Sequence, residues 1–323
     1  AEQYDNSGRL YKVNINKWDS VNLAGGAGFV KLAQSVEQDF DGTSNHKDKA
    51  ESFIYDDATG NQTQKIEWGQ VSANSDGNFS DIGNDKYTTN IAYAFNSASN
   101  VLANPANVVV LDQSGNKVKE SRYYYDNLPL ASVSLGNQTK EEGWVNGGTY
   151  INTQKTYNAL GMVLSLVDPR GKTTRYSYDV YNLYPATITN AQNQSEQYLY
   201  DYSSGKITQK TDANSRIFKF AYDGLGRIIE EKQPDLENSS ALVTKTTYVY
   251  TDTPNSSSVK KSSYLDALNS VDGYVYFDGL GRKIQERAEA EGANFSVKDF
   301  IYNNLGQLQK ESLPYFSYGA SKT

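Results

Sequence analysis

His46 is the residue on which acid–base chemistry would have to depend, because it is the only histidine and the chain contains no cysteine. A Ser-His-Asp or Cys-His site would therefore need it. His46 lies in the polar stretch 43–49, with no Gly-x-Ser-x-Gly sequence nearby. We expect an exposed histidine without a catalytic role. One histidine and no cysteine also argue against a zinc hydrolase site, so the sequence predicts no catalytic residue, no metal and no cofactor.

Paired carboxylates are the other groups that could perform catalysis. Glycoside hydrolysis needs two acids that face each other at a set distance. The candidates are Glu141, Glu142, Glu286, Glu289 and Glu291. The sequence does not give the distances between them, so a carboxylate-pair glycoside hydrolase is the weakest of our functional hypotheses.

Two further kinds of segment could bind ions. Residues 39–42 and 75–78 are rich in side-chain oxygen, but they lack the calcium-loop pattern that ends in glutamate. The glycine-rich stretch 25–28 could cradle a phosphate, but no Lys-Ser or Lys-Thr follows at the required spacing. We interpret all three segments as turns or loops.

Composition narrows the class of protein. Hydrophobic residues make up 37% of the 323 residues, and 26 residues are tyrosine. A tyrosine ring suits a strand that is packed on one side and wet at its tip. The formal charge is −7, and no basic stripe of the kind that binds nucleic acid stands out. No apolar run reaches the roughly 18 residues of a membrane span, and no signal peptide is recognisable.

A recurring motif, here called the box, predicts the element that organises the chain. It consists of an aromatic residue, Asp or Asn, two or three other residues, and Gly, often followed by Arg. Asp or Asn accepts hydrogen bonds from the following backbone amides of a turn, and Gly supplies the positive φ of a type I turn with a bulge. We predict structural turns at Asp5, Gly8, Asn158, Gly161, Asp201, Gly205, Asp223, Gly226, Asp278, Gly281, Asn303 and Gly306.

The residues around the boxes predict strands. Aromatic residues alternate before each box, as in Phe218, Phe220 and Tyr222, which places their rings on one face of a strand. From Tyr157 to Tyr222 the boxes recur every 21 or 22 residues, enough for two strands and two turns. A second turn follows about ten residues after a box, as at 168–171 and 212–215. The sequence therefore predicts a long, twisted antiparallel meander.

The repeats are not equally regular along the chain. Residues 151–323 contain the regular repeats, whereas residues 1–150 contain degenerate boxes separated by longer insertions. We predict an irregular β-region with long loops over 1–150, with one short helix near 31–38, continuous with a regular sheet over 151–323. Because Tyr4 already begins a box, we interpret Ala1 as a processed terminus or the end of an excised fragment. We expect the recurring Arg9, Arg227 and Arg282 to pack over their turns and bond a neighbouring carboxylate or carbonyl.

The boxes, with their Tyr-Asp-Gly-Leu-Gly-Arg and Phe-Asp-Gly-Leu-Gly-Arg versions at 222–227 and 277–282, resemble the RHS/YD-repeat family. The resemblance is closest to the hollow-shell (B and C) components of Tc-type insecticidal toxins. It implies an all-β sheet of hairpin repeats curved into part of a shell, in a secreted or cell-surface protein. The implied partners are the remainder of the shell or a longer parent chain, and a toxin cargo. No catalytic residue is carried over. The Asp168-Pro169 pair is superficially similar to the family's self-cleaving Asp motif, but it lies inside a regular repeat and is interpreted as a turn.

Three functions follow as hypotheses. The first is a structural shell segment, not an enzyme, that encapsulates or presents a C-terminal cargo. The second is an extracellular module that binds carbohydrate or a cell surface through its aromatic faces, since tyrosine rows serve either cross-strand packing or sugar stacking. Trp18, Trp68 and Trp144 are spread over the irregular half. The third is the hydrolase considered above. Nucleic-acid binding and a membrane span are not expected.

Overall fold

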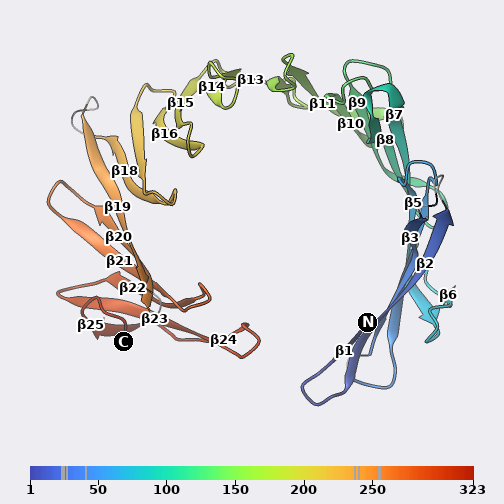
Figure 1. The fold of residues 1–323 in the computed structure, drawn as a ribbon, viewed down its shortest axis with the longest axis horizontal. Coiled ribbons are helices and arrows are strands. Elements are labelled where there is room, and N and C mark those ends of the chain that lie inside the picture. Colours follow the sequence, from blue (N-terminus) through green and yellow to red (C-terminus); the bar gives the residue numbers. More distant parts are fainter. Residues whose placement is uncertain (23–25, 27, 41, 236–237, 239–240, 254–255) are drawn as a thin grey trace. The chain divides into compact units, whose positions relative to one another are not determined.

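The computed structural model describes residues 1–22, 26, 28–40, 42–235, 238, 241–253 and 256–323, and it divides into two compact units, Ala1–Thr174 and Arg175–Thr323. The described residues form 25 strands and one short 3₁₀ helix (Figure 1). The predicted all-β fold of antiparallel hairpins is confirmed. The predicted change in regularity near residue 150 stays a prediction.

Unit 1 is an antiparallel meander in which strands pair mostly in chain order. Each strand from β1 to β5 and from β7 to β12 pairs with the next, β5 also pairs with β7, and the short β6 pairs with β5. Small buried clusters hold it, one of them formed by Val36, Ala50, Val71 and Ala73. The elements are β1 (Glu2–Tyr4), β2 (Leu10–Asn22), β3 (Gly28–Asp39), β4 (Lys47–Tyr55), β5 (Gln62–Ala73), β6 (Phe79–Asp81), β7 (Tyr87–Asn96), η1 (Ser97–Ser99), β8 (Val101–Leu111), β9 (Lys117–Tyr125), β10 (Gln138–Asn146), β11 (Thr149–Tyr157) and β12 (Val163–Val167).

Unit 2 continues the same pattern. Successive strands from β13, which begins at the division between the units, pair antiparallel as far as β23, and both β24 and β25 pair with β23. The elements are β13 (Thr173–Tyr178), β14 (Pro185–Thr189), β15 (Ser195–Asp201), β16 (Lys206–Thr211), β17 (Ile217–Tyr222), β18 (Ile228–Pro234), β19 (Leu242–Thr253), β20 (Ser256–Tyr264), β21 (Ser270–Phe277), β22 (Lys283–Glu289), β23 (Asn294–Tyr302), β24 (Leu308–Glu311) and β25 (Tyr315–Tyr318).

The last residues of the chain cover part of the unit 2 sheet. Arg287 is only 2% exposed. It donates to the carbonyl of Gly319 (2.8 Å), to Oγ1 of Thr323 (3.3 Å) and to Oε1 of Gln285 (3.0 Å). The Tyr276 hydroxyl donates to the carbonyl of Ala320 (2.5 Å). Residues 319–323 therefore cross back over β21 and β22 and close a buried polar cluster.

The strand before a box carries a bulge. The pairing register shifts between Thr156 and Tyr157, between Ala221 and Tyr222, and between Tyr276 and Phe277. A type I turn followed by a glycine in the left-handed region adds one residue to one strand, and this produces the shift. The box thus sets both the turn and the register of the strands that flank it.

The helix predicted near residues 31–38 is wrong. This segment lies within β3, which pairs with β2 on one side and β4 on the other. Pairing with both neighbours gives hydrogen-bond partners to the backbone N–H and C=O groups of this segment. These hydrogen bonds outweigh the weak helical preference of such a short stretch.

Some predicted loops fall on positions that are not described. Gly25 and Ala27 of the glycine-rich stretch 25–28 lie outside the described residues, and so does Asp41 in the oxygen-rich segment 39–42.

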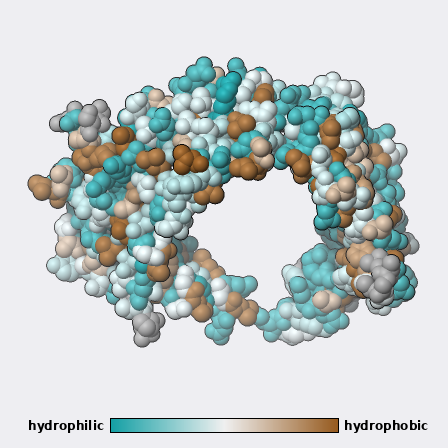
Figure 2. All heavy atoms as spheres, turned by 45° about the horizontal axis from the view of Figure 1, so that its top comes forward, coloured by the Kyte–Doolittle hydropathy of each residue, from teal (hydrophilic) through white to brown (hydrophobic). Residues whose placement is uncertain are grey.

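Both units leave much apolar surface in contact with solvent. On the face drawn in Figure 2, hydrophobic residues are interspersed with hydrophilic ones over the strands and turns. This is the expected result of a meander that is one sheet thick, because such a sheet has few layers in which to bury side chains.

Candidate functional site

The box turn at Asp223 shows how the motif works. Its Oδ1 accepts the backbone N–H groups of Leu225 (2.9 Å) and Arg227 (2.9 Å). The N–H of Gly226 donates to the carbonyl of Asp223 (2.9 Å), and the N–H of Asp223 donates to the carbonyl of Arg227 (2.9 Å). Gly226 has a φ of 76°, a conformation that side chains other than glycine, asparagine and aspartate rarely adopt. One carboxylate and one glycine thus close the hairpin.

The other predicted turn residues lie in the same arrangement, each pair within its own hairpin. Asp201 differs slightly, since its turn is one residue longer: the Gly205 N–H donates to its carbonyl (2.8 Å), and its side chain accepts from Ser203 and Ser204. The remaining pairs are Asp5 with Gly8, Asn158 with Gly161, Asp278 with Gly281, and Asn303 with Gly306.

The second turns use the same geometry. Asp168 accepts the N–H groups of Arg170 and Lys172, so the Asp168-Pro169 pair forms a turn within a repeat. Asn190 was missed by sequence reasoning, although its side chain accepts from Gln192 and Gln194 in the same way. Asn193, with a φ of 61°, stands there in place of glycine. Asparagine tolerates this conformation. An asparagine at the position that glycine holds in the box was therefore the sequence signal for this turn.

In several hairpins, a tyrosine hydroxyl near the end of a strand donates to a backbone carbonyl close to an earlier turn. Tyr222 donates to the carbonyl of Ile207 (2.9 Å), which lies just after the Gly205 turn. Burial raises the pKa of Tyr222, which keeps the hydroxyl protonated as a donor. The equivalent bonds run from Tyr200 to Pro185, Tyr250 to Ile228 and Tyr302 to Lys283 in unit 2, and from Tyr93 to Gln62, Tyr125 to Pro105 and Tyr157 to Gln138 in unit 1. We call this contact the tyrosine latch.

The box arginine reinforces the latch. Arg227 donates from Nε to Oδ2 of Asp223 (2.7 Å) and from Nη1 to Asp252 (2.9 Å). Its guanidinium carbon also lies 4.1 Å from the ring centroid of Tyr250 in the next box. One arginine therefore ties its own turn to the following repeat through an ion pair and a cation–π contact.

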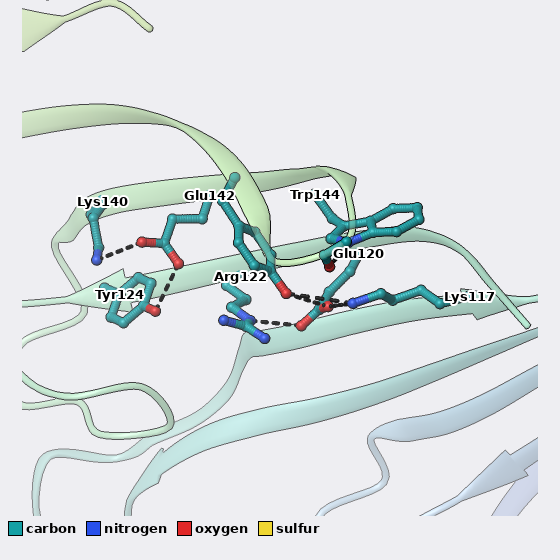
Figure 3. A network of polar contacts seen from close by, with 9 residues as sticks. Lys117, Glu120, Arg122, Tyr124, Lys140, Glu142 and Trp144 are labelled. Carbon is teal, nitrogen blue, oxygen red and sulfur yellow. Dashed lines mark hydrogen bonds and ion pairs between the residues drawn. The ribbon is translucent and has the colours of Figure 1, made fainter.

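Unit 1 contains a denser polar network on β9, β10 and β11 (Figure 3). Glu120, which is 4% exposed, accepts from Lys117 (2.6 Å), Arg122 (2.6 Å) and the Tyr150 hydroxyl (2.8 Å). Burial alone would raise the pKa of Glu120, but the hydrogen bonds from Lys117, Tyr150 and Arg122 outweigh it and lower the pKa to about 2. The carboxylate is thus held ionised.

The network extends to a second carboxylate. Glu142 accepts from the Tyr124 hydroxyl (2.9 Å) and from Lys140 (2.8 Å), and Lys140 lies 3.7 Å from the centroid of the Tyr124 ring. Burial alone would raise the pKa of Glu142, but the hydrogen bonds from Lys140 and Tyr124 outweigh this effect and lower the pKa. Sequence reasoning named Glu142 but missed Glu120, because its partner Tyr150 lies on β11, 30 residues along the chain, and nothing local marks that contact.

Two segments of the chain match a known repeat family in sequence. Residues 157–195 and 200–235 match the RHS Repeat family. The predicted resemblance is therefore confirmed for these two segments, which hold the box turns of Asn158 and Asp223 and the tyrosine latch of Tyr200. No curated protein matches this chain in sequence.

Solved structures share the fold of this chain. The crystal structure of TcdB2-TccC3-Cdc42 matches with a TM-score of 0.78 at 10% identity, over 97% of this chain and 25% of that chain. The crystal structure of TcdB2-TccC3 matches with a TM-score of 0.74 at 12% identity, over 97% of this chain and 23% of that chain. This chain thus spans about a quarter of the length of the chains it matches. At this identity the likeness shows a shared fold.

The other glutamates singled out as possible catalysts have partners within their own unit. Glu286 pairs with Lys283 (2.7 Å) in unit 2. Glu141 accepts from Gln138 (3.2 Å). The remaining two bond to backbone or lie in a turn: Glu289 accepts from the N–H of Asp272 (2.7 Å), and the carbonyl of Glu291 accepts from Asn294.

His46 is exposed, as expected, but it makes two contacts that the sequence did not predict. Its Nδ1 contacts Oδ1 of Asp48, and its ring lies 4.7 Å from that of Phe40. Asp48 is buried and also accepts the N–H of Ala73 (2.8 Å). The histidine thus caps a buried carboxylate in the β3–β4 hairpin. The spacing His-x-Asp at the start of β4 was the signal.

An aromatic cluster marks the turns that follow β13 and β15. The rings of Tyr184 and Tyr200 stack at 4.6 Å, and those of Tyr181 and Tyr202 meet edge to face at 5.1 Å. Tyr181 is 65% exposed and Tyr202 48%. The inner pair is packed, and the outer pair is open to solvent.

Among the described residues, no three acidic or histidine side chains lie close enough together to hold a metal ion. No helix among the described residues has the length and apolar character to cross a membrane.

Proposed function

We propose that this chain is a section of a protein wall: an RHS-repeat shell segment that encloses a cargo segment belonging to the same or a longer polypeptide. The tyrosine latch carries the proposal. It recurs in both units and joins seven of the hairpins to an earlier one. A hairpin alone is marginally stable, so a contact that repeats with the hairpin builds a sheet of any required length.

The fold likeness supports the same role. The matched TcdB2-TccC3 chains are about four times as long as this one, so further repeats would have to complete an enclosure. We infer that the working partners are the rest of such a shell and its cargo. The protein would act outside the cell that makes it, secreted or at the cell surface.

A catalytic role has less support. A glycosidase needs one carboxylic acid whose pKa is raised so that it can donate a proton. Among the described residues, every carboxyl group with a resolved pKa shift is shifted downward, as Glu120, Glu142 and Glu196 are. We infer that these acids serve as hydrogen-bond acceptors within the sheet.

Limited proteolysis of the gene product that carries these repeats tests enclosure. We expect cleavage confined to exposed loops, while the cargo segment survives until the RHS-repeat wall is cut. The cargo produced by itself is the control and should be degraded at once. Equal rates of cleavage for the enclosed and the free cargo would contradict the proposal.

Carbohydrate binding is a second candidate, and the exposed Tyr181 and Tyr202 favour it. Asp201 and Ser203, on either side of Tyr202, line a hollow of about 550 Å³. Exposed aromatic rings beside hydroxyl and carboxylate groups match the faces and edges of a sugar.

A glycan array tests this candidate. If it holds, the double change Tyr181→Ala and Tyr202→Ala should lower binding at least tenfold while the circular-dichroism spectrum stays unchanged. The pair Tyr124→Phe and Tyr150→Phe, in the unit 1 network, is the control and should bind as the wild type does. A wild-type chain that binds nothing on the array would remove the candidate.

A further inference from the structure

A hollow of about 430 Å³ lies on the sheet of unit 2, over β19 to β23, and we call it the unit 2 hollow. Its lining is mainly apolar: Val259, Val275 and Ala288 come from the strands, and Pro314 comes from the segment between β24 and β25. Small-molecule sites in proteins have volumes of ~300–1,000 Å³ and a mostly apolar lining with a few polar groups. The size and the lining of the hollow therefore fit a small ligand.

Gly273 lines the hollow from the middle of β21. A glycine inside a strand usually marks a bulge, a bend, or the close approach of a ligand or another backbone. Gly273 pairs in regular register with Lys261 on one side and Ala288 on the other, and its φ is not positive. A Cβ at this position would lie 3.7 Å from the carbonyl oxygen of Arg287, an ordinary contact, so the neighbouring backbone does not require glycine. The approach of a ligand is the explanation that remains.

The strands beneath the hollow are held from their other face. Successive side chains of a strand point to opposite faces of the sheet. Glu286 and Lys298 line the hollow, whereas their neighbours Gln285, Arg287 and Val297 are buried, with exposed fractions of 1%, 2% and 0%. The backbone under the hollow is therefore fixed by packing before any ligand arrives, which lowers the cost of ordering the site on binding.

One charge on this face of the sheet has no counter-charge. Glu286 pairs with Lys283 (2.7 Å), and Lys298 pairs with Glu311. Lys261 lines the hollow and is exposed, and its ammonium group forms no ion pair or hydrogen bond with any residue that the structure describes. A free ammonium group beside an apolar hollow is complementary to a ligand that carries a carboxylate.

We propose that the unit 2 hollow binds a small amphipathic anion, with its apolar body over Gly273 and its carboxylate at the ammonium group of Lys261. The body displaces water from Val259, Val275 and Pro314, and the glycine lets it come close to the strand. A flat ring and a short alkyl chain present the same chemistry to this site. The inference goes beyond the proposed shell function and does not depend on it.

Isothermal titration calorimetry with two carboxylates tests the site. Naphthoate supplies a flat ring and octanoate supplies a chain. We expect at least one of them to bind the wild type in a one-to-one ratio with a dissociation constant below about 1 mM. The neutral alcohol with the same body, naphthalene methanol or octanol, should bind at least tenfold more weakly. A wild type that binds neither carboxylate, or that binds the alcohols as tightly as the carboxylates, would overturn the proposal.

Two variants locate the bound carboxylate. Gly273→Val fills the hollow with a residue that suits a strand, so it should keep the wild-type circular-dichroism spectrum and bind at least tenfold more weakly. Lys261→Ala should weaken binding of the carboxylate but not of the alcohol. The matched control is Gly143→Val in β10, where the atom nearest to an added Cβ is also 3.7 Å away; it should bind as the wild type does. Binding that neither Gly273→Val nor Lys261→Ala weakens would also overturn the proposal.

Discussion

Replacing Asp126 by alanine is expected to lower the free energy of unfolding by roughly 3 kcal/mol, since several charge-assisted hydrogen bonds are lost at once. The Asp126 carboxylate accepts four backbone N–H groups: Ser134 (2.7 Å), Leu135 (2.8 Å), Gly136 (3.0 Å) and Asn137 (3.0 Å). Burial alone would raise the pKa of Asp126, but these four donors lower it. Urea unfolding followed by circular dichroism would measure the loss.

The change Asp126→Asn separates charge from geometry. Asp126 has a φ of 55°, and asparagine tolerates this conformation better than alanine does. Asparagine also keeps one acceptor oxygen, so its cost should be about half that of alanine. If Asp126→Ala unfolds at the same urea concentration as the wild type, the carboxylate does not organise the 126–137 loop.

Replacing Glu120 by glutamine is expected to remove a large part of the acid sensitivity of the protein. The folded-state pKa of Glu120, about 2, is below its ordinary value of 4.5. The ionised carboxylate therefore contributes stability that is fully present above pH 4.5 and is lost as the pH falls from 4.5 towards 2. A shift of this size corresponds to about 3 kcal/mol at neutral pH.

Urea unfolding at a series of pH values would check this prediction. The Glu120→Gln variant should be less stable than the wild type at pH 7, and the two should converge near pH 2. Glu141→Gln is the matched control, because Glu141 lies on the same sheet with only Gln138 as a partner; it should follow the wild-type curve. A constant difference between Glu120→Gln and the wild type from pH 7 to pH 2 would rule out the titration of this carboxylate as the cause.

The turns and the strand order were predictable because their determinants are local. Asp or Asn at the first turn position and glycine three residues later fix the hairpin without help from the rest of the fold, as Asp223 and Gly226 do. The alternation of aromatic residues then assigns the strands. The failure at 31–38 has the opposite cause: β3 is a strand because β2 and β4 pair with it, and a single segment does not contain that information.

The contacts that join the repeats were not predictable in the same way. The sequence placed Tyr222 on a strand face, but the acceptor of its hydroxyl, the carbonyl of Ile207, lies 15 residues earlier. The Tyr150 partner of Glu120 lies on β11, 30 residues later, and Arg287 is buried by a segment more than 30 residues away. Periodicity reports which face a side chain occupies, and only the register between strands decides what it meets there.

We propose above that the repeats form a wall that encloses a cargo segment. Electron cryomicroscopy of the complete gene product tests this most directly. The account predicts that residues 1–323 lie in a continuous RHS-repeat wall, with density for the cargo segment on its inner side. A structure in which these residues form a separate domain, with no enclosed volume and the cargo segment exposed to solvent, would contradict it.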